Sequence, residues 1–197
     1  MKLYLFIILL VSLSFVFIVP TYITYKKTKI NPITFGKDDN AHNFIGKIFK
    51  ILLVLLIVTF VINLLNENVY SKYFVPINYL ENAITFKIGF VFLHFSMIWI
   101  FVAQFQMGTN WRIGIDEKNK TNLVTNGLFS ISRNPIFFGM ILSIFAVFMI
   151  LPNVITFFIA FASLIIIQIQ IRLEEEFLLK QFGEKYAEYK TKTNRFL

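Results

Sequence analysis

A single uncharged stretch of 38 residues, from residue 134 to residue 171, restricts most strongly how this chain can fold. As one α-helix it would be about 57 Å long at 1.5 Å per residue, which equals about two crossings of a bilayer core of roughly 30 Å. Pro152 and Asn153 lie at its midpoint, where a proline cannot continue a helix and an asparagine favours a turn. The stretch therefore predicts a helical hairpin of two membrane spans.

Three further apolar runs precede this hairpin. They predict spans over residues 3–19, 44–65 and 83–107, the second with two lysines near its start that reach the headgroups by snorkelling. The composition agrees, because 57% of the residues are hydrophobic and 15% are charged, whereas a soluble domain carries about 25% charged residues. We therefore expect an all-α polytopic membrane protein with about five transmembrane helices, forming a single membrane domain over residues 1–197.

The basic residues indicate how these spans are oriented. Sixteen of the 19 fall in alternate connections and in the tail, namely Lys26, Lys27, Lys29, Lys37, Lys47, Lys50, Arg112, Lys118, Lys120, Arg133, Arg172, Lys180, Lys185, Lys190, Lys192 and Arg195. By the positive-inside rule, the N-terminus is expected outside and the C-terminus in the cytosol. This distribution explains the net charge of +8 without a nucleic-acid partner, so the lipid bilayer is the expected partner. The frequent Lys, Asn and Ile residues suggest an AT-rich genome and the inner membrane of a bacterium.

The segment that follows the third predicted span is rich in polar, aromatic and glycine residues. Gly108 and Gly114 predict the end of a helix there. Trp111 and Arg112 predict an anchor at the membrane interface.

Residues 133–139 read Arg-Asn-Pro-Ile-Phe-Phe-Gly and begin the hairpin. Asn134 before Pro135 predicts a helix N-cap followed by the first helical residue of the fourth span. An open helix N-terminus beside Arg133 also attracts a carboxylate or a phosphate. The structural and the functional interpretations are compatible with each other.

Three consecutive glutamates at residues 174–176 follow the hairpin. They suit a solvated helix face on which Arg172 pairs with Glu175 or Glu176. Two glutamines inside the preceding span favour an interior cavity instead, because intramembrane polar residues tend to face one. Successive helical residues point about 100° apart, so only some of the glutamates can face a cavity. We expect Glu175, held by Arg172, to face it and Glu176 to point away.

Taken together, these segments resemble the isoprenylcysteine carboxyl methyltransferase and phospholipid methyltransferase group of membrane enzymes. That group shows Arg-His-Pro-x-Tyr-x-Gly at the start of a helical hairpin and Glu-Glu-x-x-Leu-x-x-x-Phe-Gly-x-x-Tyr-x-x-Tyr after it. The second pattern corresponds here to Glu174, Glu175, Glu176, Phe177, Leu178, Phe182, Gly183, Tyr186 and Tyr189. The family His and Tyr are replaced by Asn134 and Phe137, and no Pro follows the terminal Arg195. An acid–base role at position 134 is thereby lost, whereas cofactor binding is not.

The resemblance implies S-adenosylmethionine as methyl donor, held on the cytosolic side by residues 108–197, which comprise the hairpin at 134–171 and a cytosolic amphipathic tail helix. The residues that it assigns to cofactor binding are Asn134, Pro135, Phe137, Gly139, Glu174, Glu175 and Tyr186. A carboxylate of the glutamate pair would accept the ribose hydroxyls, and Phe137, Tyr186 or Trp111 would lie against the sulfonium or the adenine. Arg133 or Arg172 would orient the acceptor, which is expected to be amphipathic or lipid-like.

Two other classes of function remain open at this point. An NADPH-dependent membrane reductase of related architecture would need a nucleotide phosphate site and a proton donor such as a tyrosine, and a non-catalytic membrane scaffold would need neither. A metal site is not expected, because the chain has no cysteine and its two histidines, His42 and His94, lie far apart in the sequence. Both histidines are interpreted as structural residues.

Overall fold

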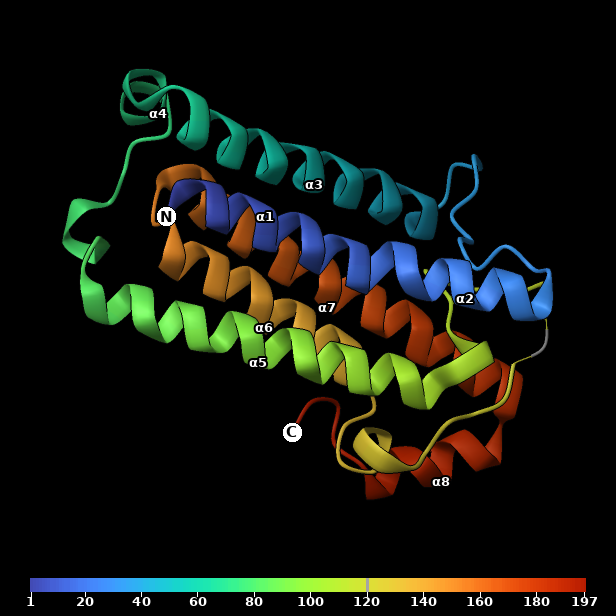
Figure 1. The fold of residues 1–197 in the computed structure, drawn as a ribbon. Helices are drawn as coiled ribbons and strands as arrows, with labels where there is room; N and C mark the ends of the chain where they lie inside the picture. Colours follow the sequence, from blue (N-terminus) through green and yellow to red (C-terminus); the bar gives the residue numbers. More distant parts are fainter. Residues whose placement is uncertain (120) are drawn as a thin grey trace.

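The computed structural model describes residues 1–119 and 121–197 and shows a bundle of helices that run side by side (Figure 1). Within these residues, four helical segments are long and apolar enough to cross a membrane, and one shorter apolar helix accompanies them. The long segments are Lys2–Thr28, Ala41–Leu65, Ala83–Asn110 and Val154–Phe182, and the shorter helix is Pro135–Ile150. This arrangement confirms the predicted all-α polytopic class.

The first segment contains α1 (Lys2–Leu13), a π-helical turn η1 (Ser14–Ile18) and α2 (Val19–Thr28). Pro20 accounts for the wide turn, because it carries no N–H for the carbonyl of Val16 and its ring clashes with that carbonyl in a regular α-helix. The side-chain amide of Gln104 donates to the Val16 oxygen instead, at 2.7 Å. A polar side chain from another span therefore replaces the hydrogen bond that the proline removes.

The middle of the chain supplies two more spans and short connecting helices. In order these are α3 (Ala41–Leu65), α4 (Glu67–Tyr73), η2 (Asn78–Leu80), α5 (Ala83–Met107), η3 (Gly108–Asn110) and η4 (Gly127–Ser130). Asn40, Asn66 and Asn82 cap α3, α4 and α5, since each side-chain oxygen accepts from a backbone N–H of the first turn. The bounds of α5 coincide with those of the predicted third span.

The predicted hairpin is present as α6 (Pro135–Ile150) and α7 (Val154–Phe182). Asn153 and Thr156 form a capping box at the turn, in which each side chain accepts from the backbone N–H of the other, at 2.9 and 3.2 Å. The 16 residues of α6 extend over about 24 Å, whereas the 29 residues of α7 extend over about 43 Å. The acidic run therefore lies on the same helix as the second hairpin span.

The tail helix α8 (Glu184–Lys192) follows α7 after Gly183, whose φ of 54° lies in the left-handed region that favours glycine. It buries Tyr186 and Tyr189 on one face and exposes lysines on the other, as expected of an amphipathic helix. Figure 1 shows α8 and the N-terminus at opposite ends of the bundle, in agreement with an odd number of passes.

Helices α5 and α6 pack with their backbones close together, because two glycines face the contact. A Cβ atom on Gly139 would lie 2.5 Å from Cγ1 of Ile100, and one on Gly89 would lie 2.9 Å from the carbonyl oxygen of Ala146. Small residues at such contacts are the usual means of close helix packing in membranes.

We predict that Gln104→Leu destabilises the folded protein by about 1–3 kcal/mol, because it leaves the Val16 carbonyl without its side-chain donor in an apolar setting. Denaturation in detergent would measure the loss. Gln168→Leu is the matched control, since the Gln168 side chain accepts from the exposed Arg172. Equal stability of both variants would contradict the role assigned to Gln104.

Candidate active site

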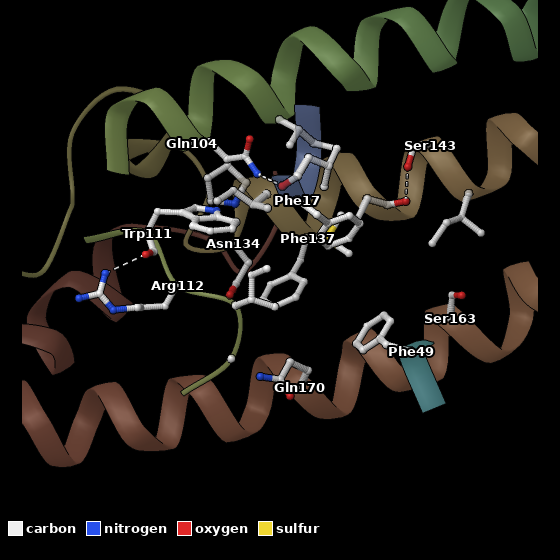
Figure 2. Close-up of a pocket in the computed structure, with 18 of the residues that line it drawn as sticks. Phe17, Phe49, Gln104, Trp111, Arg112, Asn134, Phe137, Ser143, Ser163 and Gln170 are labelled. Carbon is white, nitrogen blue, oxygen red and sulfur yellow. Dashed lines mark hydrogen bonds between the residues drawn. The ribbon is translucent and has the colours of Figure 1, made fainter. Parts of the chain in front are cut away.

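A cavity of about 530 Å³ lies inside the bundle, a volume typical of small-molecule sites. Its deep part is apolar and is lined among others by Leu9, Leu56, Phe60, Val147 and Ile159. Its other end is polar and aromatic and includes Trp111, Arg133, Asn134, Phe137, Gln170, Glu174 and Tyr189. Figure 2 shows Trp111, Asn134 and Phe137 directed into the same space, across from Gln170 on α7. One cavity thus joins a polar mouth to an apolar interior.

Asn134 occupies the N-cap position of α6, and its carbonyl oxygen accepts from the N–H of Phe138 at 3.0 Å. The predicted N-cap and the proline at the first helical position are confirmed. The Asn134 side chain does not cap the helix, because its amide donates to the Arg195 carbonyl at 3.2 Å and to Glu175 at 3.4 Å. The buried carboxylate of Glu175 competes successfully for this amide. Among the described residues, no side chain caps the first turn of α6, so its positive end stays directed toward the cavity mouth.

Glu175 is the centre of a buried charge cluster. Its Oε1 accepts from Nε and Nη2 of Arg133 at 3.2 and 3.1 Å, and the two side chains are only 6% and 8% exposed. Arg195 donates from Nε to Oε1 at 3.1 Å and from Nη2 to Oε2 at 2.7 Å. Both carboxylate oxygens are therefore occupied, and Glu175 does not line the cavity.

The predicted pairing of Arg172 with the glutamates is wrong. Arg172 is exposed and donates to the carbonyl and the side-chain oxygen of Gln168, at 2.6 and 3.0 Å. Helical side chains lean toward the N-terminus, so Arg172 reaches back by one turn and not forward to Glu175. It does not line the cavity, and the structure leaves Arg133 as the arginine of the predicted pair that does.

The three glutamates differ in their surroundings as expected. The prediction that Glu176 points away is confirmed, whereas the prediction that Glu175 faces the cavity is wrong. Glu174 lines the cavity, and its Oε1 accepts from Nε2 of the buried Gln170 at 2.8 Å. Glu176 is exposed and pairs with Lys180 at 2.8 Å. The cavity-facing carboxylate is therefore Glu174, because the cluster with Arg133 turns Glu175 to another side of α7.

The remaining predicted site residues separate into two groups. Pro135 and Phe137 line the cavity, and the Pro135 carbonyl accepts from the indole N–H of Trp99 at 2.9 Å. Gly139 and Tyr186 do not line it. Gly139 admits a neighbouring helix, and Tyr186 is 1% exposed, with its ring centroid 6.0 Å from that of Tyr189.

The interfacial anchor predicted after α5 is wrong. Trp111 is 3% exposed and lines the cavity, and Arg112 forms a 2.8 Å ion pair with Asp116. Burial alone would raise the pKa of Asp116, but hydrogen bonds from Arg112 and Asn119 outweigh it and hold this pKa below its usual value. The buried pair closes the loop and turns the indole inward.

Gly114 ends no helix, contrary to the prediction. Its φ is 92°, and a Cβ atom there would lie 2.5 Å from the His42 ring. Nε2 of His42 accepts from the N–H of Ile115 at 3.3 Å, which fits the expected structural role. In the part of the chain that the structure describes, no group of three His, Cys, Asp or Glu residues could hold a metal ion.

Two further residues, Tyr189 and Arg195, contribute to the site although the sequence alone assigns neither of them a role there. Tyr189 lines the cavity and donates its hydroxyl to the carbonyl of Phe129, while Arg195 binds Glu175. Both are spaced from their partners by 20 residues or more, so no helical periodicity connects them.

The fold and the cavity define a polytopic helical membrane protein with an internal cavity that is polar at one end and apolar at the other. Residues 83–185, more than half of the chain, match the phospholipid methyltransferase family, and the chain belongs to that family. Its structure is also similar to that of the eukaryotic intramembrane Ras methyltransferase ICMT (isoprenylcysteine carboxyl methyltransferase), determined without a monobody. The TM-score is 0.51 at 17% sequence identity, over 98% of this chain and 91% of that chain, so this likeness shows the fold. Comparison with curated proteins yields no sequence match.

We predict that Glu175→Gln lowers the thermal stability of the unliganded protein, because it leaves two arginines without their buried counter-charge. Breaking a buried pair costs roughly 3–5 kcal/mol, and the partial exposure of Arg195 places the loss at or below the lower end. Glu176→Gln is the matched control and should leave the melting temperature nearly unchanged, since Glu176 is solvated. A larger loss for Glu176→Gln would contradict the assignment of the two faces.

Proposed function

We propose that this protein is an S-adenosylmethionine-dependent methyltransferase that acts on an amphipathic or lipid-like acceptor at the cytosolic membrane surface. The cavity carries the proposal, because it joins a carboxylate, aromatic rings and an uncapped helix N-terminus to a long apolar interior, in a member of a methyltransferase family. The carboxylate, the rings and the helix N-terminus are complementary to a cationic nucleoside cofactor, and the apolar interior is complementary to a hydrocarbon chain.

The residues at the polar end fit the proposed cofactor. The carboxylate of Glu174 is able to accept both ribose hydroxyls, and the rings of Trp111 and Phe137 present faces to the adenine or the sulfonium. The first turn of α6, with the N–H groups of Ile136 and Phe137, suits the carboxylate of the methionine part. Glu175 then supports this end from behind, through its hydrogen bonds to Arg133 and Asn134.

The bound cofactor would supply a methyl group carried on a positively charged sulfur, which leaves as a neutral thioether, so the leaving group needs no protonation. What the protein adds is alignment of the acceptor atom with that methyl group in water-poor surroundings, and such alignment can account for much of a rate enhancement. Arg133 lines the same end and would orient an anionic acceptor. A carboxylate acceptor requires no general base, which fits the asparagine at position 134.

The apolar interior supports a lipid-like acceptor. Walls from α1, α3, α6 and α7 surround it, and residues such as Leu9, Leu56 and Ile159 offer no polar partner. An acceptor with a hydrocarbon chain would bury that chain here and leave its head beside Glu174 and Arg133. Each CH₂ group buried from water contributes about 0.8 kcal/mol, whereas a chain that enters from the bilayer gains little, so the apolar interior would mainly select for a hydrocarbon chain.

We predict that S-adenosylhomocysteine raises the melting temperature of the purified protein, because a ligand at 100 times its dissociation constant stabilises the folded state by about 2.7 kcal/mol. Glu174→Gln should weaken that binding about tenfold, equal to about 1.4 kcal/mol, since one charge-assisted hydrogen bond is lost. Glu176→Gln serves as the control and should bind like the wild type.

If NADPH raises the melting temperature and S-adenosylhomocysteine does not, the methyltransferase proposal is replaced by the NADPH-dependent reductase alternative. The tyrosines give that alternative no support. Burial raises the pKa of Tyr189 to about 12, and its hydroxyl is engaged with the Phe129 carbonyl. Tyr186, with its pKa raised to about 12 by burial and by the charge of Glu175, does not line the cavity.

We also propose that the N-terminus lies outside and α8 in the cytosol, in the inner membrane of a bacterium, because the basic residues gather at the α8 end of the bundle. Single engineered cysteines test the orientation without background, since the chain has none. A cysteine at Lys118 should react with a membrane-impermeant reagent only after the membrane is opened, whereas one at Lys72 should react from outside. The reverse pattern would invert the topology.

A further inference from the structure

The last five residues, 193–197, form a C-terminal strap that crosses the start of α6. The strap leaves α8 in an extended conformation, with φ −130° and ψ 133° at Thr193. Its backbone then pairs with the cavity mouth. The N–H of Arg133 donates to the carbonyl of Asn194 at 2.9 Å, and the side-chain amide of Asn134 donates to that of Arg195 at 3.2 Å. Two residues that line the cavity are thus tied to the strap.

The Arg195 side chain adds a two-point ion pair. Its Nε and Nη2 contact different oxygens of Glu175, at 3.1 and 2.7 Å, and such forked pairs fix the orientation of both partners. The same Glu175 carboxylate holds the guanidinium of Arg133. Arg195 and Glu175 lie outside the cavity lining, whereas Arg133 lies within it. A chain of contacts therefore leads from the end of the protein to a cavity-lining charge.

We propose that Arg195 is a positioning residue for the methyl-transfer site, which through Glu175 and the strap backbone holds Arg133 and Asn134 at the cavity mouth. This inference rests on the proposed function. Without the Arg195 side chain, Glu175 keeps Arg133 and the Asn134 amide as donors to Oε1, but its Oε2 loses the donor that fixes the carboxylate plane. The strap also loses its only side-chain anchor to Glu175 in the described part of the chain. Arg133 then still donates to the carbonyls of Lys190 and Thr193, but the carboxylate that sets the direction of its guanidinium is held less rigidly.

The first measurement compares cofactor affinity with stability. Arg195→Ala should weaken S-adenosylhomocysteine binding about tenfold in calorimetry at a temperature where every variant is folded. Arg195→Lys, which keeps the charge but not the forked geometry, should recover part of this loss. Lys192→Ala is the matched control, because Lys192 pairs with the exposed Glu188 and should bind like the wild type.

A double-mutant cycle shows whether Arg195 acts through Glu175. Because the two side chains form one unit, Glu175→Gln combined with Arg195→Ala should bind no more weakly than the worse single variant. If the two losses multiply, Arg195 does not act through Glu175 and the proposal is overturned.

A second readout does not depend on any ligand. The indole of Trp99 donates to the Pro135 carbonyl, so in a Trp111→Phe background the one remaining tryptophan reports on the start of α6. Arg195→Ala should shift its emission and Lys192→Ala should not.

The outcomes separate this inference from the proposed function. A wild type that fails to bind S-adenosylhomocysteine would overturn both. A wild type that binds, with Arg195→Ala equal to it in affinity and in Trp99 emission, would overturn the role of Arg195 alone. A lower melting temperature with unchanged affinity would likewise reduce Arg195 to a residue that only stabilises the fold.

Discussion

The α8 end of this protein depends on one buried carboxylate. Glu175 sits on α7 at 6% exposure, and removing such a charge from water is costly unless several donors surround it. Its donors come from two other parts of the chain, Arg133 and Asn134 before α6 and Arg195 after α8. The requirement to neutralise this group therefore joins the hairpin, the tail and the cavity mouth. The side chains at the cavity mouth come from separate elements, and Glu175 is hydrogen-bonded both to the segment before α6 and to the segment after α8.

The transmembrane part follows a different constraint, since lipid offers no hydrogen bonds to the backbone. Wherever a helix is interrupted, a polar side chain takes over. Gln104 serves the carbonyl of Val16 where Pro20 widens the first helix. At the hairpin turn, Asn153 and Thr156 both donate to the carbonyl of Leu151, at 3.1 and 2.7 Å. These polar residues in apolar spans are thus explained by local chain geometry without any part in chemistry.

Hydropathy and turn residues are sufficient to predict the bundle and the hairpin, because those properties depend on neighbours in the sequence, whereas the amphipathic tail helix is implied by the family resemblance. Which of the three glutamates faces the cavity is not predictable from sequence neighbours. Helical spacing suggested Arg172 as the partner of Glu175, whereas the actual partners are 42 and 20 residues away along the chain. Local sequence favours Trp111 as an interfacial anchor, and only the family resemblance implies a place beside a cofactor, because the ion pair of Arg112 with Asp116 that accompanies its inward direction lies inside an irregular loop.

The π-helical turn has a consequence for how the cavity wall could change in evolution. Such a turn accommodates one residue more than an α-helix, so everything before it is rotated by about 100° relative to an uninterrupted helix. Leu5 and Leu9 lie before it and line the cavity in the present phase. Loss of Pro20 with return to a regular helix would turn a different stripe of α1 inward, without any substitution in the wall itself. A single change at position 20, 15 residues after Leu5 and 11 after Leu9, could thus exchange a whole set of lining side chains and reshape the space offered to an acceptor.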